Sequence, residues 1–135
     1  MNTTINAPGA PEAIGPYSHA VRCGGFLFTS GQIPIDPETG ILVTGGIEEQ
    51  TRQVFKNLKA VLTAADMNFD NVLKGTVYLT DLGNFASVNT IYADNFAQNP
   101  PARSCVQVAA LPGGAEVEID LVAYKEPSDR EIKLL

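Results

Sequence analysis

The chain has 135 residues, of which 44% are hydrophobic and 18% are charged. A chain of this length can bury a core without metals or disulfides, so we expect one domain over residues 1–135. Nine Lys and Arg against 15 Asp and Glu give a net charge of −6, with no basic run. Because phosphate binding needs clustered positive charge, this excludes a nucleic-acid partner from our expectations. The small charged fraction fits a surface partly covered by other copies of the chain.

Targeting and cofactor signals are missing from the sequence. The start "MNTTINAPGA" lacks the basic and apolar regions of a signal peptide, and no apolar stretch reaches bilayer length. We therefore expect a cytoplasmic protein with no membrane partner. Cys23 and Cys105 are the only cysteines and His19 is the only histidine, which predicts neither disulfides nor a metal site. The glycine pairs in "GGIEE" and "PGGAE" match no phosphate-binding loop, so we expect no cofactor.

The first third of the chain predicts a shaped loop and a hairpin. "APGAPEAIGPY" has three prolines and two glycines in eleven residues, which excludes regular structure. Strands are predicted over 18–23 and 26–30, because the glycine pair between them suits a two-residue turn. The role of this first loop is either connecting or functional. "DPETG" then marks a turn in a loop that crosses the surface.

The rest of the chain alternates helices and strands. Apolar spacing predicts a helix over 47–66, with Glu48 and Glu49 at its N-terminus, then a strand over about 72–80. A second apolar stripe predicts a helix over 85–96. The runs 102–111 and 115–124, joined by "PGG", predict two further strands. The fold class is therefore α+β, with the helices on one face of a sheet.

The last two predicted strands carry the polar residues of interest. Strand alternation places Arg103 and Cys105 on one face, and Glu118 and Asp120 on one face of the following strand. A row of carboxylates favours a solvated face. If the two strands form a hairpin through "PGG", a guanidinium and a carboxylate can instead flank one pocket.

The individual residues leave alternatives open. Spacing alone favours a structural ion pair for Arg103 over a clamp for a substrate carboxylate, although the guanidinium fork suits the clamp. Cys105 needs a base to act as a nucleophile, and His19 is distant in sequence, so a buried structural side chain is favoured. "TSGQIP" ends a strand in Ser-Gly, which is a weak signal for a ligand site.

Taken together, these segments resemble the reactive-intermediate deaminase family, also called Rid or YjgF. The likeness covers nearly the whole chain, through "AIGPYS", "FTSGQIPIDPETG", "KGTVYLTDL", "PARSCVQVAALP" and "VEID" in the family's order and spacing. It implies a chorismate-mutase-like mixed sheet with two helices on one face, and a homotrimer with clefts between subunits. Residues from about 126 to 135 extend beyond the family pattern.

The resemblance also implies an activity and a site. Such proteins hydrolyse 2-imino acids, products of pyridoxal-phosphate-dependent serine and threonine dehydratases, to 2-oxo acids and ammonia, without a cofactor. By this likeness Arg103 binds the substrate carboxylate, Glu118 orients the attacking water, and Cys105 lies beside the imine through its main chain. The remaining pocket residues by the same likeness are Tyr17, Ser30, Gly31 and Asn89.

Two features depart from the family pattern, namely His19, where many relatives have Gln, and the C-terminal extension. Both bear on substrate preference more than on the reaction. A binding module that senses 2-oxo acids or amino acids without turnover is the main alternative function. A ribonuclease or translation inhibitor is a third, for which the net charge of −6 gives little support.

Overall fold

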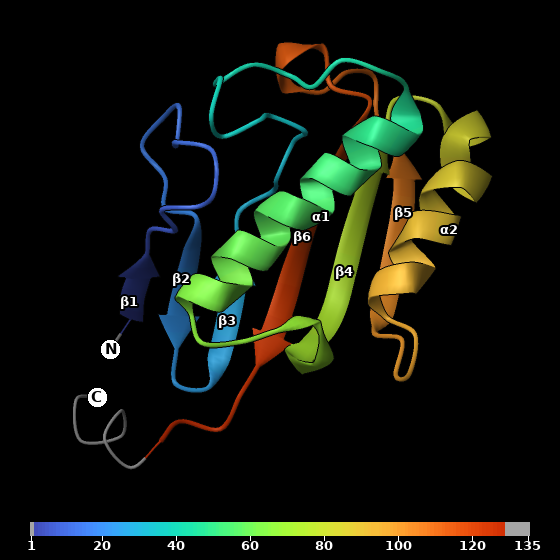
Figure 1. Ribbon diagram of the computed structural model, residues 1–135. Coiled ribbons are helices and arrows are strands. Elements are labelled where there is room, and N and C mark those ends of the chain that lie inside the picture. The colour runs from blue at the N-terminus through green and yellow to red at the C-terminus, as the bar shows by residue number, and fades with distance from the viewer. Residues whose placement is uncertain (1, 129–135) are drawn as a thin grey trace.

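The computed structural model describes residues 2–128, and residues 1 and 129–135 lie outside this range. The described chain forms one six-stranded sheet in the order β1-β2-β3-β6-β4-β5. Both long helices cover the same face of this sheet (Figure 1). The predicted α+β class and one-sided helices are confirmed. Most of the predicted C-terminal extension, residues 129–135, falls outside the described residues.

Each predicted helix and strand is present, most of them shorter by a few residues than the sequence pattern indicated. The bounds are β1 Asn2–Ile5, β2 Ala20–Cys23, β3 Phe26–Thr29, α1 Ile47–Ala64, β4 Val72–Leu79, α2 Phe85–Asn95, β5 Ala102–Gln107 and β6 Val117–Tyr124. Strand β1 was not predicted; it pairs antiparallel with β2 at the sheet edge. No helix within residues 2–128 is long and apolar enough to cross a membrane.

The β2–β3 hairpin confirms the predicted two-residue turn. Cys23 pairs with Phe26, so Gly24 and Gly25 form the link. Gly24 has φ 59°, a value that glycine adopts without steric cost. Gly25 is needed for a different reason, because a Cβ there would lie 2.5 Å from a ring carbon of Tyr124.

Helix α1 buries one apolar face and ends at a change of backbone conformation. Val54 and Leu58 are fully buried, as the predicted spacing requires. Glu48 and Glu49 lie in the first turn, where negative charge favours the helix dipole. The predicted end at residue 66 is slightly late, because Asp66 adopts φ 57° and cannot continue the helix.

The C-terminal strand lies inside the sheet, which corrects the predicted hairpin. β6 pairs antiparallel with β3 on one side and with β4 on the other. Among the strands of residues 2–128, β5 pairs with β4 alone and runs parallel to it. Helix α2 supplies the crossover that a parallel pair requires. The "PGG" segment therefore connects two strands separated by β4, and it does not form a hairpin turn.

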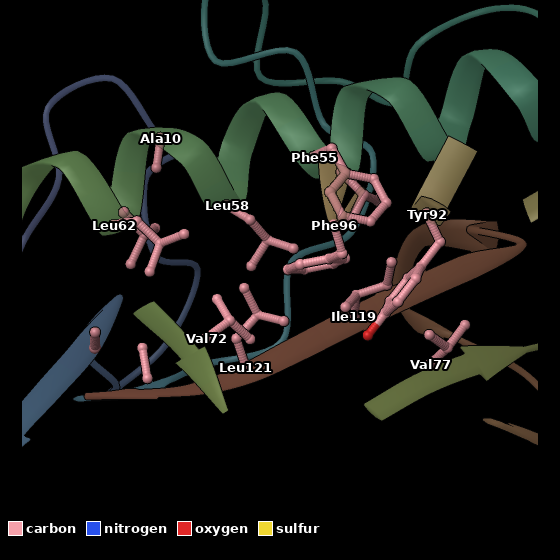
Figure 2. Packing of buried hydrophobic residues seen from close by; sticks show 14 of the residues in the cluster. Ala10, Phe55, Leu58, Leu62, Val72, Val77, Tyr92, Phe96, Ile119 and Leu121 are labelled. Atoms are coloured by element: carbon pink, nitrogen blue, oxygen red, sulfur yellow. The ribbon is translucent and has the colours of Figure 1, made fainter. Parts of the chain in front are cut away.

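Aromatic rings fill the core between α1, α2 and the sheet. Phe55 of α1 meets Tyr92 of α2 with ring centroids 5.8 Å apart, and Tyr92 meets Phe96 at 4.7 Å. Figure 2 shows these rings above the aliphatic side chains of the sheet, including Val77 and Ile119. Edge-on and tilted packing of this kind adds to the stabilisation from burial.

The opposite face of the sheet is open in the single chain and carries exposed apolar side chains at both ends. Phe26 and Phe28 of β3 are 44% and 49% exposed and pair with the last residues of β6, whereas Val106 of β5, 43% exposed, is in register with Tyr78. At the level of Glu118, the register places Tyr78 of β4 beside Glu118 of β6 on this open face. The open face therefore combines apolar surface with the carboxylate that the sequence singled out.

Candidate functional site

The predicted site residues fall into two groups on different parts of the chain. The first group surrounds a cavity of about 610 Å³ where the N-terminal loop, the end of the β2–β3 hairpin and β6 meet. Four predicted residues line it, namely Tyr17, Ser30, Gly31 and Glu118. The other lining residues are Pro11, Glu12, Ile14, Gln32, Ile33, Ile35, Pro112 and Gly113.

The walls of this cavity are fixed by hydrogen bonds from several elements. The Ser30 hydroxyl donates to the Ser18 carbonyl at 2.6 Å, which ties the N-terminal loop to the end of β3. Gln32 and Ile119 exchange main-chain hydrogen bonds, extending the sheet to the cavity rim. From α1, the buried Asn57 amide donates to the carbonyls of Ile33 and Ile35. Helix, sheet and loop therefore all position the same rim.

Glu118 lies against Gly31 and depends on the absence of a side chain there. A Cβ at Gly31 would lie 2.8 Å from Cδ of Glu118, closer than carbon atoms approach without repulsion. Burial raises the pKa of the Glu118 carboxyl above its ordinary value, and the nearby Asp120 carboxylate raises it further. A carboxylate with a raised pKa is better matched to proton transfer near neutral pH.

Tyr78 and Asp120 form a polar pair beside Glu118 on the open face. The Tyr78 hydroxyl donates to Oδ2 of Asp120 at 3.1 Å. Burial raises the pKa of Tyr78, and the Asp120 charge adds to this shift, so the phenol stays protonated and remains a donor. Glu118 therefore lies near a second carboxylate, that of Asp120, which already accepts a hydrogen bond from Tyr78.

The second group surrounds Arg103 on the helix side of the edge strand β5. Nη1 of Arg103 donates to Oδ1 of Asn89 on α2 at 2.7 Å. The guanidinium carbon lies 5.2 Å from the ring centroid of Phe85 and 4.9 Å from that of Tyr92. A neighbouring cavity of about 340 Å³ is lined by Asn89, Tyr92, Ala93, Phe96, Pro100, Pro101 and Arg103.

This arrangement does not support the ion-pair interpretation of Arg103. Within residues 2–128, no carboxylate forms a salt bridge with its guanidinium. Its neighbours are a neutral amide and two rings, which orient the guanidinium and leave its charge uncompensated. A guanidinium held in this way is suited to bind a carboxylate through two parallel hydrogen bonds.

Cys105 lies one alternation further along β5 and packs against the core. Burial raises the pKa of its thiol, and the Arg103 charge only partly opposes this effect. A neutral thiol is a poor nucleophile. The structure places Cys105 partly buried against the core, as expected for a structural side chain, and its place beside the imine stays a prediction.

Within one chain the two groups do not form a single pocket. Arg103 is in register with Gly75 of β4, and Gly75 with Leu121 of β6. Leu121 points to the helix side, whereas Glu118 is on the open face, three residues away. The expectation that Arg103 and Glu118 flank one pocket through a hairpin is therefore wrong for the single chain.

Sequence reasoning missed the residues that orient Arg103. Phe85 and Tyr92 belong to the apolar stripe that predicted α2, and nothing in that periodicity separates a core ring from one stacked on a guanidinium. Phe85 is 38% exposed, which is the sign that it does more than fill the core. Among residues 2–128, no group of His, Cys, Asp or Glu side chains is arranged to hold a metal ion.

Comparisons with known proteins agree on one family. The family model described as endoribonuclease L-PSP matches residues 7–125. A human protein named 2-iminobutanoate/2-iminopropanoate deaminase is 48% identical over 127 residues, covering 94% of this chain and 93% of the human one. A putative endoribonuclease from Thermotoga maritima superposes with a TM-score of 0.91 at 50% identity, covering 94% of this chain and 100% of that one.

A further structure, E. coli TdcF with bound serine, superposes with a TM-score of 0.86 at 40% identity. It covers 92% of this chain and 99% of the E. coli chain. Both structural matches therefore cover more than nine-tenths of this chain.

Proposed function

Because this chain belongs to the endoribonuclease L-PSP family, also called YjgF or Rid, we propose that it hydrolyses 2-imino acids to 2-oxo acids and ammonia. The observation that carries the proposal is Arg103, whose charge has no carboxylate partner within residues 2–128 and whose guanidinium is oriented by two rings and an amide. The relatives support the ligand class. One is named as a deaminase of small 2-imino acids, and another has bound serine, which also carries a carboxylate.

The reaction needs few catalytic groups because the substrate is already reactive. A protonated imine carbon is electrophilic, so binding the carboxylate and placing one water against this carbon supplies most of what is required. The water oxygen bonds to the carbon, the π electrons of the C=N bond move to nitrogen, and Glu118 takes the proton released from the water.

The resulting carbinolamine then collapses. Glu118 returns the proton to the amine and the C–N bond breaks. The hydroxyl oxygen forms the new carbonyl, and its proton passes to the departing ammonia. One protonated imine and one water therefore give one 2-oxo acid and one ammonium ion, with the carboxylate of Glu118 restored. Its raised pKa suits both proton transfers, because the group is neither too weak a base nor too weak an acid.

We further propose that the complete site forms between two copies of the chain in a homotrimer. Arg103, Asn89 and Cys105 come from one copy, and Tyr17, Ser30, Gly31 and Glu118 come from its neighbour. Two observations support this. The two groups lie on opposite faces in a single chain, and the exposed Phe26, Phe28 and Val106 provide an apolar face for association.

The shared site has a direct test by mixing two inactive variants. Arg103→Ala and Glu118→Gln each destroy every site in their own trimers. In trimers reassembled from an equal mixture, a site is intact when an Arg103 donor chain meets a Glu118 donor chain, so about a quarter of the activity returns. If the mixture stays inactive although mixed trimers form, the site is not shared between chains.

Activity itself is measured with imines generated in situ by a threonine or serine dehydratase. The protein is expected to speed ammonia release, and Arg103→Ala is expected to remove the gain. Arg52→Ala is the matched control, because Arg52 is an exposed arginine paired with Glu48 and Glu49 on α1. Equal rates for Arg103→Ala and wild type would refute the assignment.

The second candidate is a sensor that binds the same ligands without turnover, and the serine bound in the E. coli relative is the observation that favours it. Saturable binding of 2-oxobutanoate, lost in Arg103→Ala, with no rate gain for any imine tested, would identify the protein as a sensor. A rate gain that depends on Glu118 would identify it as a deaminase.

A further inference from the structure

His19 makes two hydrogen bonds to the N-terminal loop that forms part of the Glu118 cavity. The imidazole is buried, with 6% of the residue exposed. The Ala7 N–H donates to Nδ1 at 2.8 Å, and Nε2 lies 2.7 Å from the carbonyl oxygen of Pro11. His19 itself immediately precedes β2, so one side chain joins the sheet to two points of the loop.

These two contacts define the state of the ring. Nδ1 accepts from a backbone N–H, so Nδ1 carries no proton. The Pro11 carbonyl can only accept, so Nε2 must carry the proton and donate. Both hydrogen bonds exist together only in the neutral imidazole with its proton on Nε2.

The loop depends on this contact because it has few other ties. Residues 6–18 contain no helix or strand, and Pro8, Pro11 and Pro16 contribute no N–H donors. In its first half, the other hydrogen bond is a turn from Ala10 N–H to the Ala7 carbonyl. The second half is held by Tyr17 N–H to the Gly15 carbonyl, by Ile14 N–H to the Tyr17 hydroxyl at 3.4 Å, and by the Ser30 hydroxyl bond to Ser18. The imidazole therefore holds the first half of the loop.

That half of the loop leads directly into the site. Pro11, Glu12, Ile14 and Tyr17 line the same cavity as Glu118. Pro11 is both a cavity residue and the acceptor of the His19 hydrogen bond. Release of the carbonyl would free the cavity wall while leaving Glu118 and Gly31, which lie on the sheet side, in place.

We propose that His19 is a positioning residue whose imidazole holds the loop of residues 6–18 as the wall of the substrate cavity, so that ligand affinity falls when its two hydrogen bonds are lost. The inference rests on the proposed function for the identity of the ligand, a small 2-oxo or 2-imino acid. Without the acceptor at Nδ1, the Ala7 N–H becomes a buried donor with no partner.

The charged surroundings of the ring are simple. Glu12 is the charged side chain that lines the cavity of about 640 Å³ against His19, together with Asn6, Pro37 and apolar loop residues. β3 contributes the Ser30 main chain, whose N–H donates to the His19 carbonyl. A Glu12→Gln variant therefore separates the effect of the Glu12 charge from that of the imidazole.

Two substitutions distinguish hydrogen bonding from simple filling of space. His19→Gln keeps one acceptor and one donor at the end of the side chain and does not titrate. His19→Leu fills similar volume and makes neither bond. With 2-oxobutanoate as the ligand, His19→Leu is expected to weaken binding about tenfold if the loop holds its wall position in a tenth of molecules. His19→Gln is expected to stay near wild type.

The split between KM and kcat supplies a readout that a structural role alone would not give. In turnover, the effect of His19→Leu is expected in KM rather than kcat, because Glu118 stays in place, and His19→Gln is expected to restore KM. A His19→Gln variant that binds as weakly as His19→Leu, or a His19→Leu variant with the loss in kcat, would overturn the proposal.

A direct measurement on the wild-type chain covers the case in which a variant fails to fold. The sequence has one histidine, so a tag-free ¹⁵N-labelled sample gives a single set of imidazole signals. The expected form has its proton on Nε2 and accepts from the Ala7 amide through Nδ1. A proton on Nδ1 would refute the inference. This readout needs no catalysis, so it stands even if no imine is hydrolysed.

Discussion

The contact between Gly31 and Glu118 gives the sharpest test of how the carboxylate is positioned. A Cβ added at Gly31 would lie 2.8 Å from Cδ, 3.0 Å from Cγ and 3.1 Å from Oε1 of Glu118. Non-bonded carbon atoms are at their optimum near 3.5 to 4.0 Å, so Gly31→Ala must move the carboxyl by roughly 1 Å. Gly31 is not among the glycines with positive φ, and its backbone therefore accepts alanine without strain.

Such a shift affects catalysis far more than stability. The obstructed atoms form the end of a flexible side chain, and Gly→Ala also lowers the entropy of the unfolded chain, so the free energy of unfolding should stay within about 1 kcal/mol of wild type. A misplacement of about 1 Å at a reacting group costs on the order of 100-fold in rate. We expect kcat to fall by that factor with KM little changed, since Arg103 still binds the carboxylate.

The assay compares imine hydrolysis by wild type, Gly31→Ala and Gly46→Ala. Gly46 precedes α1 with φ −89° and has no atom within 4 Å of an added Cβ, so it is the matched control. In a Glu118→Gln background, Gly31→Ala should cause no further loss, because both changes act through one carboxylate. A Gly31→Ala enzyme with wild-type kcat would show that Glu118 does not orient the attacking water from this position.

Three other predictions follow from groups with defined surroundings. The pKa of Glu118 is raised in the folded chain, so kcat should fall when acidification protonates this carboxyl. The same shift makes the carboxyl stabilise the fold at low pH, and this contribution should be lost as pH rises from the ordinary pKa through the raised pKa. In urea unfolding at several pH values, Glu118→Gln should therefore flatten the dependence of stability on pH. Asn57→Ala leaves two carbonyls without their donor and should cost about 2 to 3 kcal/mol in urea unfolding, against under about 0.5 kcal/mol for the exposed Lys56→Ala. Cys105→Ala should keep kcat within about threefold of wild type, because its thiol is protonated and not a nucleophile. A large fall in kcat, equal to the fall caused by alkylating the thiols of wild type, would contradict this.

Local patterns predicted the elements well where burial imposes a period. The alternation of β6 is complete, with Val117, Ile119, Leu121 and Ala123 all within 1% exposure, and α1 follows its apolar spacing closely. β1 lacks such a signal, because Asn2, Thr3 and Thr4 are polar and exposed. It forms only because β2 offers a free edge for pairing.

The order of the strands was not predictable from the same patterns. A short "PGG" link between two strand runs is typical of a hairpin, yet Pro112–Gly114 forms a 3₁₀ turn that carries the chain past β4. In β6 each side chain on the helix side is fully buried and those on the other face are half-buried, which indicates a central strand with a partner on both sides. Which strands provide those partners depends on contacts between distant parts of the chain.

The same difference between local and long-range contacts explains which predictions about the site residues are correct and which are wrong. Alternation within β5 correctly placed Arg103 and Cys105 on one face, because that relation is local. The relation between Arg103 and Glu118 depends on the direction and order of β5, β4 and β6, and the structure puts the two side chains on opposite faces. The apolar stripe of α2 likewise predicted the helix but not the stacking of Phe85 on Arg103.

The separation of Arg103 from Glu118 has a chemical consequence for any site built from both. An arginine and a carboxylate within reach of each other in one chain would form an ion pair, and the guanidinium would then be occupied before a ligand arrived. Here Arg103 is held by neutral partners on the helix side, and Glu118 is held against Gly31 on the open face. Each half is oriented by its own neighbours, so association of two chains can bring together a cation and a base that have not already neutralised each other. In the proposed shared site, a substrate carboxylate would supply the charge that Arg103 lacks, with the imine carbon between the two halves.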